Sequence, residues 1–150
     1  MGTREAIVMI TVNFDGLCYP RNPGGVAAYG FLVRRDGQVL HRGMGVVGQG
    51  RGMTNNVAEY EALLAAARWI RENAPHEDVV FQGDSSLVIK QMRGEYQVRS
   101  ATSRKYVPQV RSILAGMDVS FRWVPRLENQ EADQLSREAY NSWNPGRIRV

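Results

Sequence analysis

The chain has 150 residues, of which 43% are hydrophobic and 23% are charged. This length and composition fit a single domain with one core, expected over residues 1–150 with a core at 7–140 and a tail at 141–150. No apolar stretch reaches the roughly 20 residues of a membrane span, and the N-terminus lacks a signal-peptide pattern, so we expect a cytoplasmic protein with no membrane partner. One cysteine and two histidines exclude a disulfide framework and a zinc finger.

The charge balance is compatible with a polyanionic partner but does not establish one. Nineteen basic residues face fifteen acidic ones, giving a net charge of +4, and all the basic residues except Lys90 and Lys105 are arginine. The planar guanidinium suits phosphate groups. Genome composition or heat adaptation explains the arginine content equally well, so charge alone decides nothing about function.

Three strand-like runs occupy the first third of the chain. Residues 7–14 are almost continuously apolar and β-branched, as in a strand that is covered on both faces. A segment rich in Gly, Pro and Asn follows at 15–25, which predicts that the strand ends at Asp15. The runs at 27–33 and 38–47 are separated by an Asp-Gly pair, which predicts a hairpin.

Helical and strand-like segments alternate in the rest of the chain. The pattern predicts helices over 55–72, 85–93, 102–114 and 129–140, and short strands over 79–82 and 119–124. Pro108 is expected to kink the third of these segments or to mark its real start. Hairpins followed by β-α-β crossovers predict an α/β fold with a mixed sheet and helices packed on it.

Four acidic residues lie at or near the ends of the predicted elements: Asp15, Glu59, Asp84 and Asp133. Two Mg²⁺ ions about 3.5–4 Å apart carry four positive charges and prefer oxygen ligands, so such a centre needs several converging carboxylates. If the first and fourth strands are parallel neighbours, Asp15 and Asp84 emerge at the same edge of the sheet. The spacing therefore indicates a metal site for phosphoryl chemistry.

Each acid also has a purely structural explanation. The alternatives are a turn at Asp15-Gly16, a capping box made by Asn56 and Glu59, an N-cap at Asp84, and an i,i+4 ion pair between Asp133 and Arg137. One shared metal site explains all four acids together, whereas the structural alternatives need a separate explanation for each of them. This favours the functional interpretation.

Small polar residues flank the proposed metal site. Asn22 lies in the Gly-Pro-rich segment, and Thr54, Asn55 and Asn56 come just before Glu59. Such side chains suit sugar hydroxyls and phosphates, although helix capping accounts for Asn55 and Asn56 as well. Cys18 is interpreted as a small filler residue and not as a nucleophile, because no histidine lies near it in the sequence.

Taken in order, these motifs resemble those of type 1 ribonuclease H. The matching segments are Asp15-Gly16 with Asn22-Pro23-Gly24, Thr54-Asn55-Asn56 with Glu59, Gly83-Asp84-Ser85, and Trp123-Val124 with Asn129, Ala132 and Asp133. The resemblance runs from residue 7 to residue 140. It implies a ribonuclease H-like fold with a five-stranded mixed sheet, in which strands one to three are antiparallel and strands four and five are parallel to strand one.

The resemblance also implies an activity and a set of site residues. Asp15, Glu59, Asp84 and Asp133 would be the catalytic ligands of two Mg²⁺ ions, with Mn²⁺ as a possible substitute. The implied substrate-binding residues are Gly16, Cys18, Asn22, Thr54, Asn55, Asn56, Ser85 and Asn129. Among them, Cys18 would act mainly through its backbone and Thr54 would bind a phosphate.

The implied protein is a monomeric endoribonuclease that cleaves the RNA strand of an RNA–DNA hybrid and leaves 5′-phosphate and 3′-hydroxyl ends. Two alternatives stay open: a non-catalytic module that binds RNA or hybrid, and a broader nuclease that also cuts double-stranded RNA.

The chain departs from the family pattern at three places. Ser86 stands where many relatives have glutamine. Many relatives carry an inserted basic, Trp-containing segment, called the handle, between the helices that follow the fourth strand; here residues 93–96 follow the preceding helix directly and the handle is absent. The loop before the last helix that carries the family's mobile histidine is absent too. A substitute handle is predicted, with a solvated helix face as the alternative, at four basic residues: Arg93, Arg99, Arg104 and Lys105.

Overall fold

A computed structural model describes residues 9–143, so the predictions for residues 7–8 and for the tail beyond Trp143 lie outside the described residues. The strands are β1 (Met9–Tyr19), β2 (Val26–Arg35), β3 (Gln38–Gln49), β4 (Asp78–Gly83) and β5 (Val119–Trp123). The helices are α1 (Asn55–Asn73), α2 (Ser86–Met92), α3 (Ala101–Ile113) and α4 (Gln130–Ser142), with a short 3₁₀ helix, η1, at Arg126–Asn129.

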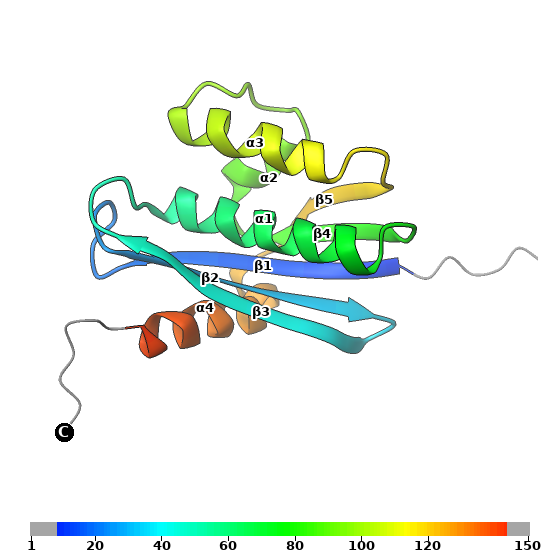
Figure 1. Cartoon of the computed structure of the whole chain (residues 1–150), viewed down its shortest axis with the longest axis horizontal. Coiled ribbons are helices and arrows are strands. Elements are labelled where there is room, and N and C mark those ends of the chain that lie inside the picture. Colours follow the sequence, from blue (N-terminus) through cyan, green and yellow to red (C-terminus); the bar gives the residue numbers. More distant parts are fainter. Residues whose placement is uncertain (1–8, 144–150) are drawn as a thin grey trace, which may run out of the picture.

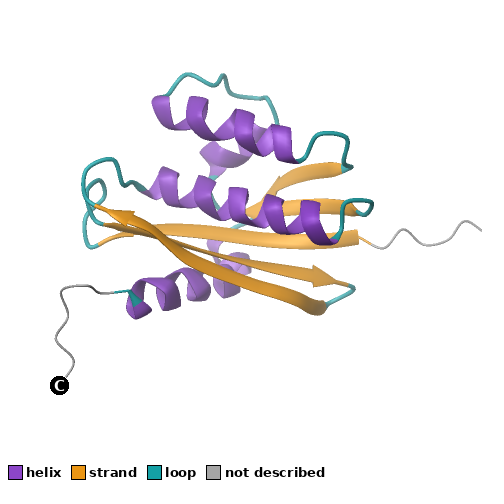
Figure 2. Ribbon diagram, viewed as in Figure 1, coloured by secondary structure: helices purple, strands orange, loops and turns teal. Residues whose placement is uncertain are grey.

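The strands form one mixed sheet in the order β3-β2-β1-β4-β5. β1, β2 and β3 are antiparallel neighbours, whereas β4 is parallel to β1 and β5 is parallel to β4. Helices α1, α2 and α3 lie on one side of the sheet and α4 lies on the other (Figure 1). This arrangement, also visible in Figure 2, confirms the predicted α/β fold. Within residues 9–143 no helix combines the length and apolar character needed to cross a bilayer.

β1 is longer than the sequence predicts, and the prediction that it ends at Asp15 is wrong. Antiparallel pairing with β2 continues from Asp15, opposite Gly30, to Tyr19, opposite Val26. The parallel pairing with β4 stops earlier, at Asn13. The prediction failed because pairing with β2 outweighs the turn-forming composition of this segment. Asp15 therefore lies inside a strand, at the point where β1 loses its neighbour on the β4 side.

The core lies between the sheet and helices α1 to α3. Ile10, Val12 and Phe14 of β1 are fully buried there, as is Leu63 of α1. This cluster fixes the position of α1 over β1, and so the position of the acidic residue that α1 carries.

α3 passes through Pro108 without a break, so Pro108 does not mark the helix start. Proline removes one backbone hydrogen bond from a helix interior. Its neighbours Tyr106, Val107 and Val110 are buried in the main core, and this packing outweighs the loss.

The segment between α2 and α3 consists of residues 93–100 and contains no helix. η1 likewise follows β5 after only two residues. Both observations agree with the predicted absence of a handle and of a long loop before the last helix.

Candidate metal and nucleic-acid site

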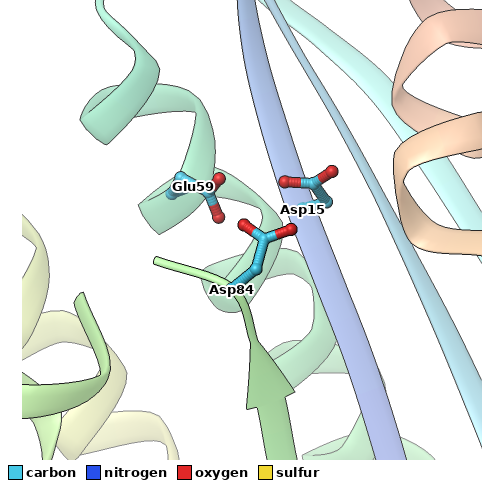
Figure 3. Close-up of side chains that lie close together, drawn as sticks. All are labelled: Asp15, Glu59 and Asp84. Carbon is cyan, nitrogen blue, oxygen red and sulfur yellow. The ribbon is translucent and has the colours of Figure 1, made fainter. Parts of the chain in front are cut away.

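Three carboxylates from three different elements converge beside β1. Asp15 comes from the middle of β1, Glu59 from α1, and Asp84 from the residue directly after β4. Each offers an oxygen atom that lies within 4.8 Å of those of the other two. Figure 3 shows the three side chains pointing toward one another across the gap left where β4 ends.

Glycines allow the helices to come close enough to build this cluster. A Cβ atom on Gly16 would lie 2.4 Å from the backbone nitrogen of Glu59, so only glycine lets α1 rest on β1 here. On the other face, a Cβ atom on Gly30 would lie 2.5 Å from Cβ of Leu135 in α4. Gly30 is paired with Asp15, so both helices approach the sheet next to this carboxylate.

Burial makes the negative charge of the cluster costly. Desolvation is the main reason why the pKa of Asp15 is raised to about 7; a hydrogen bond with Glu59 opposes this shift, and the nearby charges of Asp84 and Asp133 add to it. Burial also raises the pKa of Glu59 well above its usual value, with the charge of Asp15 as the next cause. A positive charge beside these carboxyl groups would therefore stabilise their ionised forms.

A divalent cation fits this donor set. Within residues 9–143, the Oε2 atom of Glu59 is buried and has no hydrogen-bond partner. A buried carboxylate oxygen that lacks a protein donor normally has an ordered water or an ion as its partner. Carboxylate oxygens are the ligands that Mg²⁺ and Mn²⁺ prefer. Asp15, Glu59 and Asp84 are the residues that would hold it.

Asp133 lies close to the cluster but belongs to a separate ion pair. Its Oδ2 atom accepts a hydrogen bond of 3.1 Å from Nε of Arg137, which is the i,i+4 pair that the sequence offered as an alternative. Asp133 also lines a cavity of about 460 Å³ together with Asp15 and Glu59. Both interpretations of Asp133 therefore have a structural basis.

The capping alternatives for the other acids are wrong. The hydroxyl of Thr54 caps α1 by accepting from the backbone nitrogen of Val57, at 3.0 Å. α2 is capped by Ser85, whose hydroxyl accepts from Val88 at 3.3 Å. Neither Glu59 nor Asp84 is needed at a helix end, which leaves their carboxylates for the cluster.

Polar residues join the start of α1 to the end of β1 and to the loop that follows it, next to the cluster. The side-chain oxygen of Asn22 accepts from the backbone nitrogen of Asn55, at 3.0 Å, and that of Asn55 accepts from the backbone nitrogen of Cys18, at 2.9 Å. Asn22, Asn55 and Asn56 are exposed, whereas Cys18 is buried and its thiol donates to the carbonyl of Arg21. The three asparagines thus form an accessible polar rim, and the cysteine fills space.

Asn129 stands apart from the other predicted substrate-binding residues, because it is only 1% exposed. Its Nδ2 atom donates to the carbonyl of Phe14 at 2.9 Å and to Oδ2 of Asp84 at 3.4 Å. Asn129 therefore donates to the carboxylate of Asp84 from the protein interior and does not face the surface.

The cavity beside the carboxylates includes residues that sequence reasoning missed. Arg126, Arg137 and Tyr140 line it, and the ring of Tyr140 packs edge-on against Tyr19 with their centroids 5.2 Å apart. Their positions depend on how η1 and α4 pack against the sheet, so no local motif places them at the cavity. Gly30 did carry a signal, since glycine inside a strand often marks close backbone approach.

The two histidines lie away from the carboxylates. His41 is on the edge strand β3, where it stacks on Trp69 with ring centroids 4.9 Å apart. His76 is exposed and precedes β4, at the end of that strand opposite Asp84.

Comparisons with known proteins identify the family. The family model described as reverse transcriptase-like matches residues 13–139. The crystal structure of ribonuclease H1 from Halobacterium salinarum superposes with a TM-score of 0.80 and 34% identity, covering 90% of this chain and 99% of that chain. The chain belongs to the type 1 ribonuclease H family.

Two other solved members of this ribonuclease H family are similarly close in structure. The N-terminal ribonuclease H domain of a Mycobacterium tuberculosis protein has a TM-score of 0.80 and 29% identity, covering 90% of this chain and 95% of that chain. LC11 ribonuclease H1 in complex with an RNA/DNA hybrid gives a TM-score of 0.80 and 29% identity, covering 89% and 97%.

Several curated relatives are longer than this ribonuclease H chain. Ribonuclease HI of Halobacterium salinarum is 37% identical over 127 residues, which make up 84% of this chain and 61% of that relative. The chain covers still smaller shares, 39% and 33%, of the next two relatives.

Proposed function

We propose that the chain is a divalent-metal-dependent endoribonuclease that cleaves the RNA strand of RNA–DNA hybrids and leaves 5′-phosphate and 3′-hydroxyl ends. The observation that carries this proposal is the cluster of buried Asp15 and Glu59 with half-buried Asp84, in which one oxygen lacks any donor among the described residues. The hybrid bound to the related LC11 enzyme supports the substrate class.

The four acids divide the task of holding two Mg²⁺ ions, or Mn²⁺ in their place. Asp15 lies between the α1 and α4 sides of the site and would serve both ions. Glu59 and Asp84 would hold the ion on the leaving-group side, and Asp133 would help to hold the ion on the water side. Bound ions of this kind supply Lewis acidity to the phosphate and lower the pKa of a coordinated water.

The other residues of the site orient the substrate. Asn22, Asn55 and Asn56 present amide groups at the exposed rim, where ribose 2′-hydroxyls are accessible partners. Gly16 lines the cavity beside the carboxylates, where a substrate phosphate would lie. The hydroxyls of Thr54 and Ser85 lie at the starts of α1 and α2, where backbone N–H groups favour anions. The protein thus binds the RNA strand through its sugars and phosphates.

Histidine has no part in this proposal. Both histidines are remote from the cluster, and Arg126 and Arg137 supply positive charge at the cavity instead. Proton transfer to and from solvent therefore depends on water and on the carboxylates.

The decisive experiment compares duplexes and metals. Purified protein is incubated with end-labelled RNA–DNA, RNA–RNA and DNA–DNA duplexes in Mg²⁺, Mn²⁺ or EDTA, with the Asp15→Asn variant as control. We expect metal-dependent cleavage of the RNA strand of the hybrid only, with 5′-phosphate ends. Cleavage of RNA–RNA would establish the broader nuclease, and tight hybrid binding without cleavage in any metal would establish the binding module.

A further inference from the structure

A pair of buried asparagines lies directly behind the carboxylate cluster. Asn13 of β1 is 7% exposed and Asn129 of η1 is 1% exposed. The Nδ2 atom of Asn13 donates to Oδ1 of Asn129 at 3.0 Å. Burying amide groups is costly unless they are hydrogen-bonded, so a buried pair of amides between β1 and η1 calls for a reason.

The pair fixes which way the amide of Asn129 faces. Nδ2 of Asn129 donates to the carbonyl of Phe14 and to Oδ2 of Asp84. If the amide were flipped, its oxygen would face these two acceptors and its nitrogen would face the donor of Asn13. The donor of Asn13 thus selects the orientation that presents N–H groups to Asp84.

We infer that Asn13 is a positioning residue for Asp84. By occupying the oxygen of Asn129, it keeps the amide nitrogen aimed at Asp84 and restricts rotation of that carboxylate. Asp84 then faces Asp15 and Glu59 in the arrangement of Figure 3 before any ion arrives. The inference rests on the proposed function, because orienting Asp84 matters only if the cluster binds metal.

The location of Asn13 supports this role. It lies two residues before Asp15, so both side chains project from the same face of β1. It is also the last residue of β1 paired with β4, opposite Gln82, one residue before the strand end that carries Asp84. Partners behind metal-binding carboxylates typically change metal affinity or activity by about 10- to 100-fold when they are removed.

The first test uses protein without metal. Asn13→Leu replaces the amide with an apolar side chain of similar size, and Asn13→Ala serves if the larger variant fails to fold. Hydrogen exchange of the Asn129 side-chain amide is followed by NMR in EDTA. We expect exchange to become at least tenfold faster, and an unchanged rate would overturn the inference.

The second test measures Mn²⁺ affinity by titration calorimetry. We expect about tenfold weaker binding for Asn13→Leu, with the cleavage rate recovering at saturating metal. Gln91→Met is the matched control, because Gln91 is also a buried amide, bonded to Tyr60 within the helical layer. It should lower the melting temperature without weakening Mn²⁺ binding.

A double variant separates positioning from general destabilisation. If Asn13 acts through Asn129, then Asn13→Leu added to Asn129→Leu should change Mn²⁺ affinity by less than twofold. Multiplicative losses, or an equal loss in the Gln91→Met control, would refute the inference. Metal binding that follows this pattern without any hybrid cleavage would refute the proposed function alone.

Discussion

Replacing Asp15 with asparagine should stabilise the metal-free protein while abolishing cleavage. The substitution keeps the shape of the side chain and its oxygen, which accepts from the backbone nitrogen of Gly16 at 2.9 Å. It removes one negative charge from a cluster in which burial already raises the pKa of Asp15 from 3.8 to about 7.

The direction of the pH dependence follows from this raised pKa. A carboxyl group whose pKa is higher in the folded state than in the unfolded state stabilises the fold at pH values below its unfolded-state pKa. This stabilisation is lost as the pH rises from the unfolded-state pKa to the folded-state pKa. The parent protein should therefore lose stability between about pH 4 and pH 7. The Asp15→Asn variant lacks this titration. Its free energy of unfolding should therefore equal that of the parent at pH 4, exceed it increasingly as the pH rises, and show a constant excess above pH 7.

The size of the effect has a ceiling of about 4 kcal/mol, from roughly three pKa units at 1.36 kcal/mol each. The buried amide nitrogen offsets part of this gain, so we expect about 1–3 kcal/mol at pH 8. For a domain of this length, that gain corresponds to a rise in melting temperature of roughly 3–10 °C.

The assay is thermal unfolding at pH 4, 6 and 8, in EDTA and in Mg²⁺. Mg²⁺ at one hundred times its dissociation constant should stabilise the parent by about 2.7 kcal/mol and the variant far less. Asp118→Asn is the control, because Asp118 is exposed and lies at the opposite end of β4 from the cluster. An Asp15→Asn variant no more stable than the parent at pH 8 in EDTA would refute the reasoning, as would an equal advantage at pH 4.

Three further predictions address the fold, the histidines and the basic residues. Gly30→Ala should lower the free energy of unfolding by about 1–3 kcal/mol, because the added methyl group would overlap Leu135 and push α4 away; chemical denaturation measures this, and an unchanged midpoint would contradict the packing. His41→Ala and His76→Ala should each keep kcat within about twofold, whereas a hundredfold loss in a folded variant, roughly 2.7 kcal/mol, would overturn the mechanism. Removing the basic charges that follow α2 and those at the start of α3 should raise KM for the hybrid and flatten its salt dependence, unless these side chains only form a solvated face. The residues to change are Arg93, Arg99, Arg104 and Lys105.

The sequence alone determined the order and type of the elements. Hydrophobic periodicity and turn residues are local signals, and they located the five strands and the four helices to within a few residues, apart from the end of β1. Motif order likewise singled out Asp15, Glu59, Asp84 and Asp133 as candidates for one shared site, although Asp15 lies inside β1 and not at its end.

Only the tertiary structure decided how these residues share the site. The end of β1 depends on pairing with β2, a contact between segments whose spacing no local pattern encodes. The close approach of α1 and α4 depends on Gly16 and Gly30, whose missing side chains matter only once the layers pack. Asn129 appears in the sequence as one more polar residue near Asp133, yet folding buries it behind Asp84. A side chain's role at the site follows from its solvent exposure and its partners, and long-range packing sets both.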